Sequence, residues 1–143
     1  SSTFWTERIG PTAAISTLKV MRDMKSWNKV TTIGRGIKKG WLELASKYNI
    51  KININGLDSL AGFTFDTKKH LAYKTILTQE MLKRGYLAST NCYACTEHSQ
   101  DIVDRYMENL EEVFFLISEC ESGRKVDDIL EGPICNGTFK RLN

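Results

Sequence analysis

The stretch "IKININGLDSLAGFTF", residues 50–65, decides the fold class. Apolar and polar residues alternate over 50–56, which is typical of a strand with one face buried. The Asn55-Gly56 pair favours a turn, and "LAGFTF" at 60–65 follows as a second strand that ends before Asp66. We therefore expect a hairpin, and a hairpin is stable only when other elements cover its apolar face.

Helical patterns precede the hairpin. A first helix is expected from Gly10-Pro11, since proline in the first turn of a helix needs no amide donor. "SWNK" at 26–29 interrupts the pattern, and a second helix follows. Its glycine-rich part, "GRGIKKG" at 34–40, is interpreted as a solvated, loosely packed surface. The apolar stripes consist of Ile15, Leu18, Met21 and Met24 in the first helix, and of Ile33, Ile37, Trp41, Leu44, Ala45 and Tyr48 in the second.

Further elements follow the hairpin. An amphipathic helix is expected over 68–85, with Gly85 as its stop. Two short strands, "YLAS" at 86–89 and "YACTEH" at 93–98, then flank a polar turn. Ser99 is the expected N-cap of a long helix that ends at Gly123. Its apolar stripe consists of Ile102, Tyr106, Leu110, Val113, Phe114 and Ile117. A short helical stretch, 126–132, lies in the tail.

Helices intermixed with short strands predict an α+β fold. We expect a small, largely antiparallel sheet of three to four strands, covered by helices mainly on one face. The chain has 143 residues, which favours one domain. Its net charge of +3 comes from cations interleaved with acids, so no nucleic-acid partner is expected. Without a long apolar run or a secretory signal, no membrane partner is expected and a cytoplasmic protein is predicted.

The sequence contains few candidates for catalytic chemistry. Cys92 and Cys95 have C-x-x-C spacing, but they fall in an expected strand without a second ligand pair, so no metal site is predicted. His98 is a candidate general acid or base, with a structural role as the favoured alternative. The opening residues Ser1, Ser2, Thr3 and Thr6 place hydroxyl groups before a helix start. That arrangement suits either a phosphate or an ordinary helix cap.

Four segments resemble, in order and spacing, the class-III pyridoxal-phosphate aminotransferases. They are "SSTFWTERIGPTAAISTLKVM" (1–21), "LAGFTFD" (60–66), "TILTQEMLKRGYLAS" (75–89) and "CTEHSQDIVDRYMENLEEVF" (95–114). The nearest branch is that of glutamate-1-semialdehyde 2,1-aminomutase-like enzymes. The resemblance covers 1–119 and implies that residues 1–123 are the C-terminal small domain of a fold-type-I enzyme. Residues 1–10 would be the handover loop from a large domain, and 124–143 a tail.

The resemblance also implies a function. Such enzymes move an amino group through a Schiff base of pyridoxal 5'-phosphate. Thr3, with Ser2 beside it, matches the position that contacts the cofactor phosphate across a homodimer interface. The Schiff-base lysine and the aspartate at the pyridine nitrogen belong to the large domain, so no catalytic residue is assigned in this chain. The fragment alone is expected to be inactive and not to bind the cofactor stably, and its partner is the large domain.

Two departures from the family pattern bear on the substrate. "WTERIGP" replaces the family's "S-G-N-P", and no arginine precedes a Pro-Pro step near 90. A carboxylate clamp needs that guanidinium group, so an ω-amino acid is disfavoured and another amino-acid or amino-sugar type of substrate is expected. We also expect an exposed apolar patch at Trp5, Met21 and Trp41, where the large domain docks. The alternative is a free-standing, non-catalytic interaction or regulatory module, which a reading frame starting at Ser1 would favour.

Overall fold

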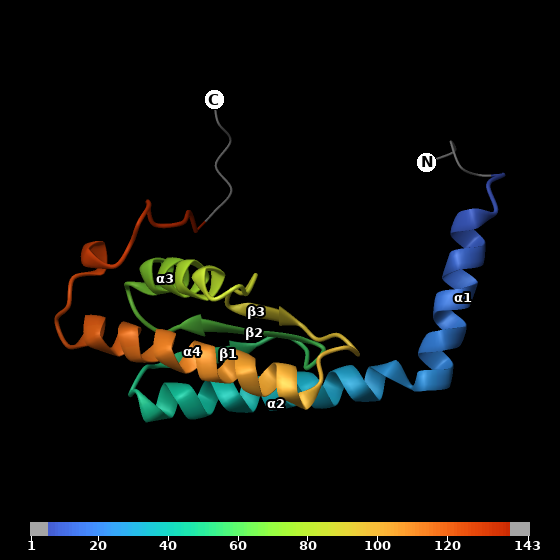
Figure 1. The fold of residues 1–143 in the computed structure, drawn as a ribbon, viewed down its shortest axis with the longest axis horizontal. Coiled ribbons are helices and arrows are strands. Elements are labelled where there is room, and N and C mark those ends of the chain that lie inside the picture. The colour runs from blue at the N-terminus through green and yellow to red at the C-terminus, as the bar shows by residue number, and fades with distance from the viewer. Residues whose placement is uncertain (1–5, 138–143) are drawn as a thin grey trace.

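The computed structural model of the chain describes residues 6–137 (Figure 1). Four helices, three strands and one 3-10 turn follow one another in this part of the chain. In chain order they are α1 (Ile9–Met24), α2 (Ser26–Lys47), β1 (Ile52–Asn55), β2 (Leu60–Phe65), α3 (His70–Lys83), β3 (Asn91–Tyr93), α4 (Gln100–Glu121) and the 3-10 turn Val126–Asp128. Among residues 6–137, no helix has the length and apolar character to cross a membrane.

The three strands form one antiparallel sheet with the order β1-β2-β3. Ile54 of β1 lies opposite Phe63 of β2, and Leu60 of β2 lies opposite Tyr93 of β3. Ala61, Phe63 and Phe65 alternate along β2 onto one face and are buried there. The predicted α+β fold with a small antiparallel sheet is confirmed.

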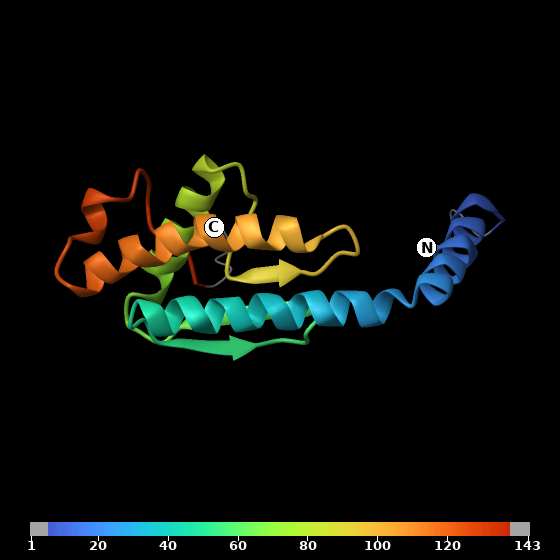
Figure 2. The same cartoon turned by 60° about the horizontal axis from the view of Figure 1, so that its bottom comes forward.

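Helices α2, α3 and α4 cover the apolar face of the sheet (Figures 1 and 2). The ring of Trp41 packs on Phe63 with 4.8 Å between centroids, and Phe114 of α4 lies 6.2 Å from the same ring. The Ser99 hydroxyl accepts a hydrogen bond from the Ile102 amide, which confirms the predicted N-cap of α4. The stripes predicted for α2 and α4 thus meet the strand in one core.

The prediction of strands at 86–89 and 93–98 is wrong in its boundaries. Gly85 adopts φ +84 after α3, and the Tyr86 amide donates a hydrogen bond to the Met81 carbonyl. The start of "YLAS" therefore belongs to the C-terminal cap of α3 and does not form a strand. β3 comprises Asn91–Tyr93 because only Leu60, Ala61 and Gly62 of β2 offer it partners. The chain therefore enters a turn within the segment expected to be a strand.

Helix α2 differs from its prediction in two respects. It begins at Ser26, because Lys25 alone, at φ 47, separates it from α1, so "SWNK" is its first turn rather than a break. Its glycines are not all loosely packed. A Cβ on Gly34 would lie 1.6 Å from the Asp58 carbonyl oxygen, and one on Gly40 would lie 2.7 Å from the Met107 methyl group. Gly34 thus lets the hairpin loop contact the helix directly.

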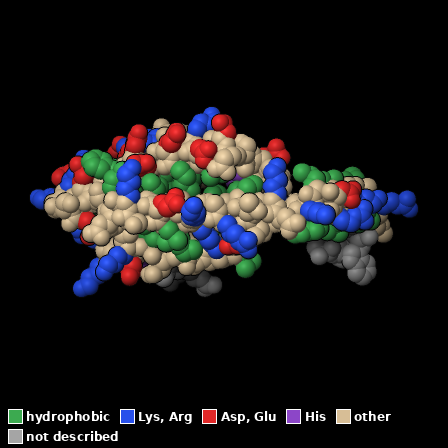
Figure 3. All heavy atoms as spheres, turned by 90° about the horizontal axis from the view of Figure 1, so that it is seen from below, with side chains coloured by type: hydrophobic (Ala, Val, Ile, Leu, Met, Phe, Trp, Pro, Cys, Tyr) green, Lys and Arg blue, Asp and Glu red, His purple; other side chains and the backbone are tan. Residues whose placement is uncertain are grey.

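Helix α1 projects away from the body of the domain (Figure 2). None of its residues is buried, and apolar side chains cover much of its surface (Figure 3). Met21 is 42% exposed, as predicted for the patch. Trp41, also assigned to that patch, is fully buried because it faces Phe63 of the sheet, so that part of the prediction is wrong. Trp5 lies outside the described residues.

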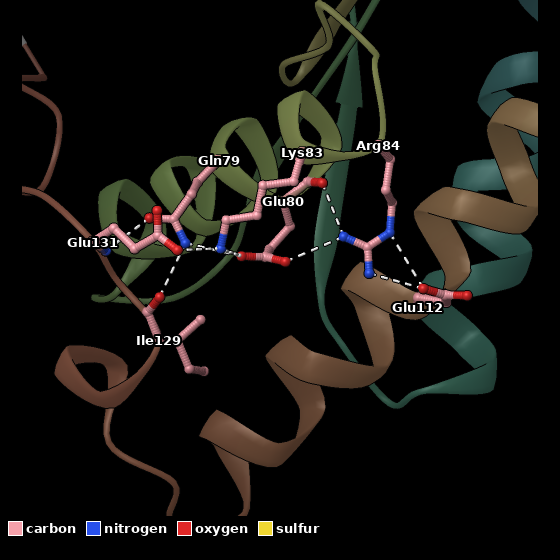
Figure 4. A network of polar contacts seen from close by, with 7 residues as sticks. All are labelled: Gln79, Glu80, Lys83, Arg84, Glu112, Ile129 and Glu131. Atoms are coloured by element: carbon pink, nitrogen blue, oxygen red, sulfur yellow. Dashed lines mark hydrogen bonds and ion pairs between the residues drawn. The ribbon is translucent and has the colours of Figure 1, made fainter.

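The tail packs along the outer side of α3 as a strap. Within residues 124–137, the only regular element is the turn at Val126–Asp128, which is shorter than the stretch expected at 126–132, and Ile129 is buried in the core. The Gln79 side chain donates to the Ile129 carbonyl (3.0 Å) and accepts from the Glu131 amide (2.8 Å), as Figure 4 shows. The tail residues up to Gly137 are therefore part of the folded domain.

Candidate functional site

The predicted phosphate contacts, Ser2 and Thr3, lie outside the described residues, and their role stays a prediction. The start of α1 itself is described. The Glu7 carboxylate accepts hydrogen bonds from the Ile9 amide (2.5 Å) and the Gly10 amide (3.1 Å). This side chain already satisfies the first free amides of the helix and provides the negative charge that a helix N-terminus favours. A phosphate contact would therefore depend on the hydroxyl groups.

An apolar depression lies where β3, the 86–88 segment and the first turns of α4 meet above α2. We call it the β3–α4 hollow; its volume is about 320 Å³. Apolar walls come from α2, α4 and β3, and tyrosine rings and His98 complete the lining. The wall residues used below are Ile37, Leu87, Cys92, Ile102 and Val103.

Two tyrosines line the hollow, with 6.0 Å between the centroids of the Tyr86 and Tyr106 rings. The Tyr106 hydroxyl oxygen accepts a hydrogen bond of 3.0 Å from Nε1 of Trp41. Burial raises the pKa of Tyr106, so its hydroxyl group stays protonated. The hollow is thereby linked through one hydrogen bond to the buried indole of the core.

His98 lies at the edge of the hollow, in the turn that precedes α4. The Cys95 amide donates to Nδ1 of His98 (3.2 Å), which leaves the proton of the neutral ring on Nε2. Among residues 6–137, no carboxylate forms an ion pair with this ring. The backbone contact supports the structural interpretation of His98, while Nε2 keeps a donor that the contact does not use.

The two cysteines of the C-x-x-C pair are separated by the end of β3. Cys92 lies in the strand and lines the hollow, where burial raises the pKa of its thiol, and Cys95 is exposed in the following turn. In the part of the chain that the structure describes, no group of three or more histidine, cysteine or acidic side chains could hold a metal ion. The absence of a metal site in the whole chain stays a prediction.

A second depression, the α2–α4 groove, runs between the two long helices and has a volume of about 490 Å³. Apolar side chains lie along the seam above α2, and acidic side chains gather beyond it (Figure 3). Lys39, the basic residue of its lining, pairs with Glu43 at 3.5 Å. The groove lining is completed on the acidic side by Asp104, Glu108 and Glu111, and on the apolar side by Ile33, Leu44, Val103 and Met107.

These surfaces do not form a site for pyridoxal phosphate. Such a site needs a lysine for the covalent anchor and donors or cations for the phosphate. The hollow is lined by neither lysine nor arginine, and the groove is acidic. Of the other lysines, Lys38 and Lys83 are paired with carboxylates. That the Schiff-base lysine lies outside this chain stays a prediction.

A solved structure has a similar fold. It is that of the Sphingopyxis sp. FumI protein in its PLP internal aldimine form, with a TM-score of 0.69 and 17% sequence identity. The match covers 82% of this chain and 29% of that one, so the chain spans less than a third of the length of that protein. No protein-family model matches the sequence, and no curated protein does. A fold similar to most of this chain thus also occurs as one part of a pyridoxal-phosphate protein.

Proposed function

We propose that residues 1–123 are the C-terminal small domain of a pyridoxal-phosphate-dependent aminotransferase or aminomutase. The observation that carries this proposal is the fold similarity, which extends over 82% of this chain but 29% of a protein described with bound cofactor. The order of sequence segments supports the finer assignment to the class-III, glutamate-1-semialdehyde 2,1-aminomutase-like branch. The enzyme would move an amino group of an amino-acid or amino-sugar type of substrate, in the cytoplasm.

Helix α1 supports the presence of a large partner domain. Residues 9–18 contain no charged side chain, yet Ile9, Ile15 and Leu18 are 79%, 55% and 64% exposed. Large apolar side chains that gather on one exposed surface ordinarily mark a contact with another protein or domain. A large domain of the same enzyme, in a homodimer, would supply that cover; within this chain, α1 packs against α2.

Within such an enzyme, this chain would bind and orient rather than carry the reaction. The cofactor, when bound, supplies an electron sink for bond cleavage at the amino carbon. Ser2 and Thr3 would donate hydroxyl hydrogen bonds to its phosphate group. The lysine anchor would belong to the large domain, so the isolated chain is expected to be inactive.

Co-expression tests the docking role of α1. The polypeptide encoded directly upstream of Ser1 in the same reading frame is co-expressed with the tagged 143-residue chain. The tagged chain is captured by affinity, and the amount of upstream polypeptide retained with it is measured. Leu18→Asp places a charge on α1, and Leu82→Asp, at a residue 56% exposed on α3, is the matched control. We expect retention for the unmodified chain and the control, and at least a tenfold loss for Leu18→Asp. A reading frame that starts at Ser1, or equal retention of both variants, contradicts the proposal.

A further inference from the structure

We propose that the β3–α4 hollow binds a small uncharged organic molecule that has an apolar body and a hydrogen-bond-accepting oxygen, such as a ketone. Its volume of about 320 Å³ lies at the lower end of the range for small-molecule sites. The inference concerns this chain's own residues and requires no cofactor.

The walls of the hollow favour an apolar body. Ile37 and Val103 are buried behind the surface, at 2% and 8% exposure, and form the deep part of the lining. Leu87 and Ile102 are 98% and 39% exposed at the same hollow. An apolar ligand would remove these side chains from water, which favours its binding.

The charge of the lining excludes an ionised ligand. No lysine, arginine, aspartate or glutamate lines the hollow. A carboxylate or ammonium group would lose hydration there without a lysine, arginine, aspartate or glutamate of the lining to pair with, which disfavours its binding. The acidic side chains near His98 line the α2–α4 groove instead.

Three polar side chains of the lining, His98, Tyr106 and Tyr86, each keep a donor for an acceptor oxygen, and the Asn91 amide, which also lines the hollow, can donate or accept. Nε2 of His98 carries the ring proton because Nδ1 accepts from the Cys95 amide. The Tyr106 oxygen accepts from Trp41 Nε1 and the Tyr86 oxygen accepts from Asn109 Nδ2 (3.5 Å), so each hydroxyl keeps its own proton to donate. A carbonyl oxygen accepts from such groups without needing to donate, which matches this set.

Trp41 provides a reporter inside the core. Its Nε1 donates to the same oxygen through which Tyr106 would donate to a ligand. When the Tyr106 hydroxyl donates to a ligand, its oxygen is polarised and the hydrogen bond from Trp41 Nε1 changes in strength. The Trp41 indole resonance should therefore shift. Trp27, which is 49% exposed on α2, serves as an internal control.

The test is a titration of the ¹⁵N-labelled chain followed by nuclear magnetic resonance. The probes are cyclohexanone, cyclohexanecarboxylate and cyclohexylamine, which have similar size but differ in charge. We expect saturable shifts of the Trp41 indole and the His98 ring with cyclohexanone, and at least tenfold weaker binding of both charged probes. Ile102→Asp and Leu87→Asp should each weaken cyclohexanone at least tenfold, and Leu82→Asp should not.

Equal affinity for the three probes, absence of saturable shifts, or unchanged binding in the hollow variants would overturn the proposal. If Ile102→Asp disturbs the fold, Leu87→Asp decides, because its side chain is 98% exposed and supports no packing. The titration is done without pyridoxal phosphate or a large domain. Its failure therefore leaves the proposed enzyme domain standing, and failure of the co-expression test leaves the hollow proposal standing.

Discussion

Gly34 and Gly36 lie two residues apart in α2, and substitution by alanine should change stability in opposite directions. A Cβ at Gly36 meets no atom within 4 Å, so Gly36→Ala should show only the helix propensity gain of about 1 kcal/mol. A Cβ at Gly34 would lie 1.6 Å from the Asp58 carbonyl oxygen, far below the 3.0 Å that real contacts keep. The hairpin loop would have to retreat by roughly 1.4 Å, a shift typical of an overpacked site.

The loop cannot retreat freely, because α2 holds it in several places. Asp58 pairs with Arg35 at 2.7 Å and with Lys38 at 3.1 Å, and Lys38 also donates to the Gly56 carbonyl at 2.8 Å. Overpacking costs about 1–3 kcal/mol, and we expect the upper end, about 3 kcal/mol. The higher helix propensity of alanine offsets about 1 kcal/mol of that cost, so Gly34→Ala should lower the free energy of unfolding by about 2 kcal/mol.

Urea unfolding followed by far-ultraviolet circular dichroism measures both variants. The two free energies of unfolding should differ by about 3 kcal/mol, which is more than a hundredfold in the folding equilibrium. The slope of the free energy of unfolding against urea concentration should be unchanged, because both variants expose the same surface on unfolding. Equal stabilisation by the two alanines would refute the packing of the hairpin loop against α2.

Three further predictions concern other parts of the chain. Gln79→Ala removes two of the polar contacts that hold the tail and leaves the bond from the Cys135 amide to the Thr75 hydroxyl and the Lys83–Glu131 pair in place. It should cost about 1–3 kcal/mol in urea unfolding and speed proteolysis of the tail, whereas Gln100→Ala on the surface of α4 should do neither. Burial acts to raise the pKa of Glu80, but hydrogen bonds from Lys83, Gln79 and Arg84 outweigh it and lower the pKa (Figure 4). This carboxylate therefore stabilises the fold above about pH 4.3 and loses that contribution below it, so the free energy of unfolding should fall more steeply with acid in the unmodified chain than in Glu80→Gln. Amides of α1 should exchange with deuterium faster than those of 37–45 in α2 by several orders of magnitude, because no residue of α1 is buried; equal protection would contradict the projecting position of the helix.

Local patterns were sufficient to predict most elements. The alternation of 50–65 and the Asn55-Gly56 turn predict the hairpin, and Ser99 and Gly123 delimit α4. These features depend on neighbours in sequence, such as the contact of the Ser99 hydroxyl with the Ile102 amide. The fold class followed from their order.

What could not be predicted depends on contacts between distant segments. β3 is set by its pairing with 60–62, so the strand predicted over 93–98 was misplaced. Trp41 is buried by Phe63, and Gly34 is required by Asp58, 24 residues away in sequence. The hollow likewise forms only when the 86–88 segment and α4 meet above α2, and among its residues only His98 and Cys92 were considered for chemistry from the sequence. The predicted phosphate contacts remain outside the described residues.

The location of the covalent anchor tests the central claim most directly. The full reading frame that contains these codons is expressed, incubated with pyridoxal phosphate, reduced with borohydride and digested, and the modified lysine is located by mass spectrometry. The account predicts one stoichiometrically modified lysine outside residues 1–143. A single modified lysine within 1–143, or no modification of the full product, would contradict it.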